Sequence, residues 1–306
     1  MKRLLLIMLV LCSCSKEATL ETPIVFTGTK AGETGNAARL SEFHYLTYDY
    51  VLGSWVGELG SLAVPGGSSS GLFVPADASR VYWPEGKTYS FYAVGYNADV
   101  VVEDSDVEFG SSMMMYSSGT SAVLMIRNPG HNVDWLAAKN VHLGKTDGIP
   151  LFFNHICAKI SSITLDLSAY EAWLAERELD IAEVKVVYCT LTDADEQTFI
   201  YSSEPEALFN KSSWDYTDSP ARTLDREKLP YYAFPGRHIL KMRIQTVDSL
   251  GIQRIDDRVL AGEVSLPMGA DCELNIHINP HDRDLEIKVI AGIAAWQSGD
   301  VGIVNE

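Results

Sequence analysis

Positively charged residues are scarce in this sequence. It has 24 lysine and arginine residues against 41 aspartate and glutamate residues, which gives a formal net charge of −17. A chain this acidic is repelled by the phosphates of nucleic acids, which argues against a nucleic-acid partner. The same repulsion opposes adsorption of the protein surface to anionic lipids. Membrane attachment, if it occurs, would therefore have to come from acyl chains.

Cysteine is also scarce, and the cysteines form no metal-binding or disulfide pattern. Of five cysteines, three lie beyond the N-terminal segment: Cys157, Cys189 and Cys272. The sequence has no C-x-x-C pair and no Cys/His quartet, so a structural zinc site is not expected. Because apolar residues flank all three cysteines, we interpret them as buried free thiols. One disulfide plus a spare thiol is the alternative.

No motif points to an enzyme. Residues 67–71 (GSSSG) match G-x-S-x-G as a string, but no buried strand precedes them and no helix follows, so we predict a loop. His277 and His281 are four residues apart with Pro280 between them, so they cannot share a helical face as a metalloprotease pair does. We therefore expect no catalytic residues, no cofactor and no metal.

The N-terminus has the pattern of an export signal. Lys2 and Arg3 precede a short apolar run, residues 4–11, which is too short to span a bilayer of roughly 30 Å. The run ends in LCSC and resembles a lipobox, in which the cysteine after a small residue is lipidated. We assign Cys14 as the lipidated residue, because Cys12 follows a bulky leucine. Residues 1–13 are then a lipoprotein signal peptide; an ordinary secretory signal is the alternative.

Alternating apolar and polar residues dominate the rest of the chain. Residues 240–247 and 272–278 are examples, and turn signals such as Pro84-Glu85-Gly86 recur between such runs. This pattern predicts short half-buried strands and an all-β antiparallel sandwich. Ser168 and Glu171 fit a capping box and predict one helix. Residues 131–140 predict one or two helical turns, giving one or two short helices in all.

A cluster of turn residues at 145–148 suggests a boundary near residue 150, with a domain of ordinary size on each side. We therefore predict two tandem antiparallel β-sandwich domains. Residues 14–40 would form an N-terminal tether with a first strand at 23–29. The N-terminal domain would cover 41–150 together with that strand, and the C-terminal domain would cover 151–306.

One tryptophan suggests a ligand-binding surface. Trp214 lies in a long polar segment, residues 203–228, and is the tryptophan with the strongest expectation of exposure. An exposed aromatic side chain would suit carbohydrate binding. This observation supports a stably anchored surface glycan-binding lipoprotein as one hypothesis for the function.

Several segments together resemble the fimbrillin family, the subunits of type V pili in anaerobic Gram-negative bacteria. The resemblance covers most of the chain, and the order and spacing of the segments carry it. Besides the lipobox ending at Cys14, the matching segments are IVFTGTKA (24–31), WPEGKTYSFYAV (83–94), DWLAA (134–138), LFFNHICAKI (151–160) and LPMG with the following LNI (266–276). The resemblance implies two β-sandwich domains in tandem and a non-enzymatic subunit.

The resemblance also implies an assembly mechanism. Family members reach the outer membrane as lipoproteins, and a trypsin-like protease then cuts after a basic residue near the N-terminus. The cut removes the lipid and the first strand, and a neighbour's C-terminal strand fills the groove. Lys30 and Arg39 are the candidate cut sites here. Arg39 is the better match to an arginine-specific protease, and it lies in a Gly/Ala-rich stretch.

The C-terminal run offers a candidate donor strand at 285–296. Apolar residues of one parity would enter a neighbour's groove: Leu285, Ile287, Val289, Ala291 and Ile293. Strand addition would pair exposed backbone edges and bury these side chains together. The alternative is that this run is simply the last strand of its own sheet.

The sequence supports two hypotheses for the function. The first is a structural and adhesive subunit of cell-surface fimbriae, held to outer-membrane lipid through Cys14 before processing and bound to other subunits afterwards. A host protein or glycan would be its adhesion target. The second is the stably anchored glycan-binding lipoprotein. The sequence leaves open whether a fimbrial subunit would act in the shaft, at the tip or as the anchor.

Overall fold

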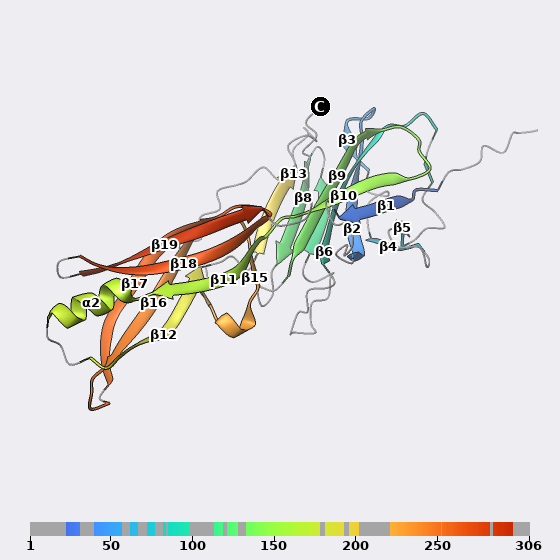
Figure 1. Ribbon diagram of the computed structural model, residues 1–306. Helices are drawn as coiled ribbons and strands as arrows, with labels where there is room; N and C mark the ends of the chain where they lie inside the picture. The colour runs from blue at the N-terminus through green and yellow to red at the C-terminus, as the bar shows by residue number, and fades with distance from the viewer. Residues whose placement is uncertain are drawn as a thin grey trace, which may run out of the picture.

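The computed structural model describes residues 23–30, 40–56, 62–66, 72–76, 82–83, 85–97, 113–118, 121–127, 133–177, 181–192, 196–201, 221–251, 253–281 and 284–295. These residues are mostly strand, with one α-helix and one short 3-10 helix among them. The all-β class predicted from the sequence is confirmed. Figure 1 shows an elongated molecule, with one group of strands at the right and another at the left.

The right-hand group is a single sheet that closes on itself, and we call it the barrel. Its strands are β1 (Phe26–Lys30), β2 (Leu40–Asp49), β3 (Ser54–Trp55), β4 (Leu62–Pro65), β5 (Leu72–Pro75), β6 (Tyr89–Asn97), β9 (Trp135–Leu143) and β10 (Ile149–His155). The order is β3-β2-β4-β5-β1-β10-β9-β6, and β6 also pairs with β2, which closes a ring of seven strands. The strand β3 lies outside the ring, paired with β2.

Side chains that alternate between buried and exposed positions fill the inside of the barrel. In β10, Ile149, Leu151 and Phe153 are buried while Phe152 between them is exposed. The inward side chains of the seven ring strands contribute to one apolar cluster rich in phenylalanine. An interior filled by side chains makes this a packed core and not a channel.

The left-hand group consists of two four-stranded sheets that share one apolar core, and we call them the paired sheets. One sheet has the order β15-β11-β18-β19 and the other β14-β12-β16-β17. Their strands are β11 (Ala158–Asp166), β12 (Glu183–Thr192), β14 (Ala221–Thr223), β15 (Tyr231–Ala233), β16 (Gly236–Val247), β17 (Gln253–Leu266), β18 (Ala270–His281) and β19 (Asp284–Ala295). Side chains from both sheets, such as Leu274 and Met242, meet in that core.

A third, three-stranded sheet has the order β13-β8-β7. Its strands are β7 (Met113–Ser118), β8 (Ser121–Arg127) and β13 (Glu196–Tyr201). Figure 1 shows β8 and β13 between the barrel and the paired sheets. A separate apolar cluster at this junction joins Ile126 of β8 and Trp135 of β9 to Phe234, which follows β15.

The strand arrangement differs from the antiparallel sandwiches expected from the sequence. The N-terminal sheet closes into a ring, and two strand pairs, β1 with β10 and β11 with β18, are parallel. Alternation reports only that one face is buried, which holds for a sandwich and for a barrel alike. The domain boundary near residue 150 remains a prediction; the strand that begins there, β10, belongs to the barrel.

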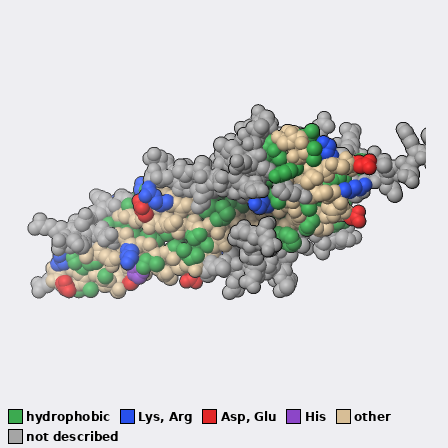
Figure 2. All heavy atoms as spheres, turned by 90° about the horizontal axis from the view of Figure 1, so that it is seen from above, with side chains coloured by type: hydrophobic (Ala, Val, Ile, Leu, Met, Phe, Trp, Pro, Cys, Tyr) green, Lys and Arg blue, Asp and Glu red, His purple; other side chains and the backbone are tan. Residues whose placement is uncertain are grey.

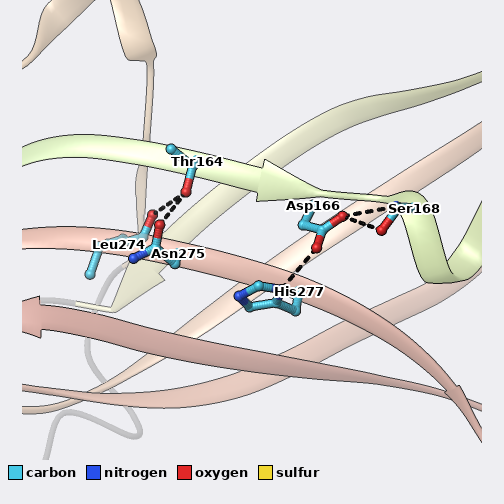
Figure 3. A network of polar contacts seen from close by, with 6 residues as sticks. All are labelled: Thr164, Asp166, Ser168, Leu274, Asn275 and His277. Atoms are coloured by element: carbon cyan, nitrogen blue, oxygen red, sulfur yellow. Dashed lines mark hydrogen bonds and ion pairs between the residues drawn. The ribbon is translucent and has the colours of Figure 1, made fainter.

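The predicted helix exists, but its capping is different. The helix α2 (Ser168–Glu176) has no side-chain cap at Leu167. Asp166 instead supplies hydrogen bonds at the start of the helix. Its Oδ1 accepts from the Ser168 amide at 3.0 Å and from the Ser168 hydroxyl at 2.6 Å. Its Oδ2 lies 3.2 Å from Nδ1 of His277, as Figure 3 shows. The expected capping box of Ser168 and Glu171 was therefore wrong.

The expected helical turns at 131–140 were also wrong where the structure describes them. Residues 135–143 form β9, which lies between β6 and β10 in the barrel. Trp135, Leu136, Ala137 and Ala138 are all buried. Without period-2 alternation the run carries no strand signal, and pairing on both sides decides its conformation.

Burial of His44 makes barrel stability sensitive to mild acid. Burial lowers the pKa of this β2 histidine from 6.5 to about 4. Between these values the unfolded chain binds a proton that the folded chain does not, so stability falls as the pH drops from about 6.5 to 4. Because His44 is partly exposed, we expect His44→Gln to remove about 1–2 kcal/mol of this loss. Urea unfolding at pH 7 and pH 4.5 measures it, and equal losses in both proteins would contradict the assignment.

Candidate functional site

The strand β1 holds the barrel closed. On one side it pairs in parallel with β10 along its whole length, from Phe26 opposite Ile149 to Lys30 opposite Phe153. On the other side it pairs with β5 through only two residues, Phe26 and Thr27. Without β1, the ring would be open between β5 and β10. We call the space that β1 occupies the β1 slot.

Aromatic side chains anchor β1 in its slot. The Phe26 ring centroid lies 4.7 Å from that of Tyr45 and 5.5 Å from those of Phe43 and Phe91. Phe26 is fully buried, and Ile24 just before β1 is 1% exposed. Burial also raises the pKa of Tyr45, so this ring stays neutral. The slot is therefore apolar and closely filled by the first strand.

Backbone groups complete the slot. The Ile149 amide donates to the carbonyl of Val25 at 2.8 Å, which extends the pairing with β10 by one residue. If β1 were removed, the outward amides and carbonyls of β10 would lose their partners, and the phenylalanine cluster would be exposed to water. Such an edge is a template for an incoming strand.

The structure places few of the predicted site residues at this slot. Lys30 is the last residue of β1, and its backbone is still paired with β10. Arg39, Cys14 and Trp214 lie outside the described residues. Lipidation at Cys14, processing at Arg39 and glycan binding at Trp214 therefore stay predictions, and so does the glycan-binding lipoprotein.

The predicted donor segment forms the edge strand β19. It pairs antiparallel with β18 from Ala270 opposite Ala295 to His281 opposite Asp284. Along the predicted parity, Ile287 is buried, Val289 and Ala291 are half-buried, and Ile293 is 60% exposed. The side chain of Leu285 lies outside the described residues. In this state β19 is the last strand of its own sheet, and its role as a donor stays a prediction.

A glycine lets β19 approach the facing sheet. A Cβ on Gly262 of β17 would lie 3.0 Å from the carbonyl oxygen of Ile287 and 3.1 Å from a methyl of Val289. The two edge strands β17 and β19 therefore meet closely on this side of the paired sheets. This contact holds the C-terminal strand in place within its own chain.

A polar pair at the junction was not predicted from the sequence. Asp134 Oδ1 lies 2.6 Å from His155 Nδ1, and both side chains are buried. The second carboxylate oxygen accepts from the Asn97 side-chain amide at 3.0 Å. These residues come from the ends of β6, β9 and β10, so the pair fixes the barrel strands where the chain passes on to β11. Nothing in the spacing of the three residues indicates this contact.

The three described cysteines are free thiols. Cys157 and Cys272 are buried, and Cys189 is half-buried. Burial raises the pKa of Cys189 to about 11, although Arg226 opposes the shift, and it raises that of Cys272 to about 11 with help from Asp271. At neutral pH both are protonated and poorly nucleophilic. Among the described residues, no group of His, Cys, Asp and Glu could hold a metal ion.

Within the described ranges, no helix combines the length and apolarity needed to cross a bilayer.

Comparisons with known proteins match this chain to fimbrial structures. No protein-family model matches the chain, and no curated protein matches it significantly. A fimbrial protein from Bacteroides vulgatus is similar in structure, with 14% identity and a TM-score of 0.47 over 89% of this chain and 99% of that chain. A fimbrial assembly protein from Parabacteroides distasonis has 10% identity and a TM-score of 0.40, over 90% and 99%. The C-terminally truncated tip fimbrial protein Mfa3 from Porphyromonas gingivalis has 10% identity and a TM-score of 0.37, over 89% and 99%.

Proposed function

We propose that this chain is a structural, adhesive subunit of cell-surface fimbriae. It is exported to the outer membrane as a lipoprotein anchored through Cys14, and it joins other subunits by strand exchange after N-terminal proteolysis. The observation that supports this proposal is the position of β1. A short strand at the N-terminus closes the barrel, and one cut behind it would free it from the rest of the chain.

The chemistry of the slot suits an incoming strand. With β1 gone, β10 and β5 present unpaired backbone groups, and the rings of Phe43, Tyr45 and Phe91 line an apolar trough. A strand with alternating apolar side chains satisfies both needs at once, because its backbone pairs and its side chains fill the trough. The exposed trough would otherwise drive non-specific association.

The C-terminal strand of a neighbouring copy is the proposed donor. Twelve residues of β19 are paired with β18 in one chain, so the strand must leave its sheet before it can enter another subunit. In the slot of β1, the pairing with β18 would be replaced by pairing with β10 and by burial of apolar side chains. The apolar parity that begins at Leu285 supplies side chains for the slot.

Processing gives a direct test of this proposal. We expect an arginine-specific protease to cut after Arg39 and to release β1, because Lys30 lies inside the β1–β10 ladder, where cleavage requires prior opening. Arg39→Gln should abolish both the cut and the appearance of oligomers, while Lys30→Gln should leave both unchanged. Intact mass and size-exclusion chromatography measure the two results. Cut protein that stays monomeric would refute strand exchange.

A further inference from the structure

The turn between β2 and β3 exposes three large apolar side chains in a row. Tyr50 is 46% exposed, Val51 67% and Leu52 65%. Single exposed apolar residues are ordinary on protein surfaces, but a contiguous group marks an interaction site. We call residues 50–53 the tip turn.

Partly buried hydrogen bonds hold the tip turn. The carboxylate of Asp49 accepts from the amides of Val51 at 2.9 Å and Leu52 at 3.0 Å, and its other oxygen accepts from Lys87 Nζ at 2.9 Å. The Tyr50 amide donates to the carbonyl of Thr88 at 3.0 Å. Burial would raise the pKa of Asp49, but these donors lower it overall, so the clamp is charged at neutral pH. The fold therefore presents the three side chains in a fixed arrangement.

The tip turn lies at the end of the barrel that is remote from the paired sheets. The strand β9 begins at the junction with Trp135 and ends at Leu143, which pairs with Tyr89 of β6. Tyr89 in turn pairs with Asp49, the last residue before the tip turn. Figure 1 shows β3, which follows the tip turn, at the top of the barrel, away from the paired sheets.

The N-terminal segment enters the barrel at the same end. Phe26, at the start of β1, lies opposite Ile149, which begins β10 directly after the turn that follows β9. Before β1, Pro23 forms an isolated bridge with Tyr82, which is itself 37% exposed. Next to it, Trp83 Nε1 donates to the carbonyl of Lys87 at 3.2 Å, and Lys87 binds the Asp49 clamp. The point of chain entry and the tip turn are thus connected through one small set of contacts.

The length of the tether restricts the position of an acyl anchor. Eight residues separate Cys14 from Pro23, and the fully extended chain between them spans at most about 30 Å. An acyl chain on Cys14 would therefore hold this end of the barrel close to the bilayer. This step rests on the lipoprotein part of the proposed function.

Charge does not oppose contact between this end and lipid. The described charged residues of the neighbouring turns are of both signs: Glu85, Lys87, Lys145 and Asp147. On the face seen in Figure 2, acidic and basic side chains likewise lie together at the barrel end. Among the described residues, negative charge is therefore not concentrated at this end, and lysine stems can lie along an apolar surface with their ammonium groups in water.

We propose that the tip turn is a membrane-contact site, in which Tyr50, Val51 and Leu52 enter the interface of the bilayer that carries the Cys14 anchor. Three side chains alone bind lipid weakly, but an anchor supplies a high local concentration of bilayer. Contact at two points fixes the orientation of the subunit. The barrel end faces the membrane, and the paired sheets, with their C-terminal strand, point away from it.

The test uses an artificial anchor, so that it depends neither on lipidation nor on strand exchange. The chain, with a histidine tag in place of residues 1–14, is bound to phosphatidylcholine vesicles that contain a nickel-chelating lipid. Val51→Cys is labelled with the environment-sensitive dye NBD. The matched control is Leu250→Cys, because Leu250 is 80% exposed. It lies in the β16–β17 turn, which Figure 1 shows at the end of the molecule opposite the barrel. Labelling of the unsubstituted chain measures the contribution of its own cysteines.

We expect NBD emission at position 51 to shift to the blue and to rise severalfold on vesicles, with no change at position 250. Leu52→Asp should abolish the response at position 51. Equal responses at both positions, or no response at position 51, would overturn the proposal. A response at position 51 that rises with protein concentration without vesicles would also overturn it, because the contact would then be with a second copy. None of these results depends on whether cut protein forms oligomers.

Discussion

Replacing Phe26 with alanine is expected to lower the free energy of unfolding of the barrel by about 3–5 kcal/mol, the usual cost of deleting a fully buried phenylalanine. Phe26 contacts three aromatic rings, and these rings also line the slot that would open without β1. Urea unfolding followed by tryptophan fluorescence measures the loss. Thr27→Ala is the matched control, because Thr27 lies on the same strand with an exposed side chain, and surface changes of this kind stay within about 0.5 kcal/mol.

The same substitution should speed tryptic cleavage after Lys30, whose backbone is paired with β10. A protease that needs β1 to detach acts on the open form, and its rate follows the population of that form when opening is fast. If Phe26→Ala weakens the attachment of β1 by about 3 kcal/mol, the open population rises by up to roughly 100-fold, at 1.4 kcal/mol per tenfold. Cleavage at low protease concentration would show this. Lower stability with an unchanged cleavage rate would mean that β1 detachment does not limit this cleavage.

Introducing a charge on the donor parity of β19 is expected to abolish assembly while leaving the monomer folded. Ile293 is 60% exposed in the single chain, so Ile293→Asp should change its stability by less than about 1 kcal/mol. In a neighbour's slot, the same aspartate would be buried without a partner, which costs several kcal/mol. Protein carrying Ile293→Asp should remain monomeric by size-exclusion chromatography after the N-terminal cut.

The control for this prediction lies on the other face of the same strand. Ile290 is 44% exposed and has the opposite parity, so Ile290→Asp would point away from the slot and should still assemble. Loss of assembly in both variants would mean that the whole strand tolerates no charge. Assembly by Ile293→Asp would show that β19 is not the donor in the predicted register.

Much of the strand content could be predicted because burial follows a simple period. In β18, Cys272, Leu274, Ile276 and Ile278 are buried, as their alternation with polar residues indicates. The first strand, predicted at 23–29, is β1 at Phe26–Lys30. The position of α2 was predicted as well, although Asp166 provides the hydrogen bonds that were assigned to a capping box.

The strand partners could not be predicted in the same way. Alternation shows which side chains turn inward, but it does not say that β1 lies parallel to β10, or that β6 closes the ring on β2. These pairings join residues far apart in the chain, and no local signal encodes them. The prediction for residues 135–138 was wrong for a local reason. Both faces of this segment are buried, so it lacks the alternation that identifies a strand.

For the candidate sites too, some features could be predicted from the sequence and others depend on the fold. The resemblance to fimbrillins implied a removable first strand, and the sequence supplied Lys30 and Arg39 as candidate cut sites. The aromatic rings that hold Phe26 come from β2 and β6, which only the fold brings together. The tip turn gave no sequence signal, since Tyr50, Val51 and Leu52 look like part of a strand until Asp49 is seen to fold the chain back.

The most direct test of the central claim is to cut the purified chain with an arginine-specific protease and to determine the mass and N-terminus of every species that forms. We predict oligomers built from subunits that begin at Leu40, with the β1 fragment lost. Subunits that lose β1 completely and stay monomeric at high concentration, with a stable barrel, would contradict assembly by strand exchange.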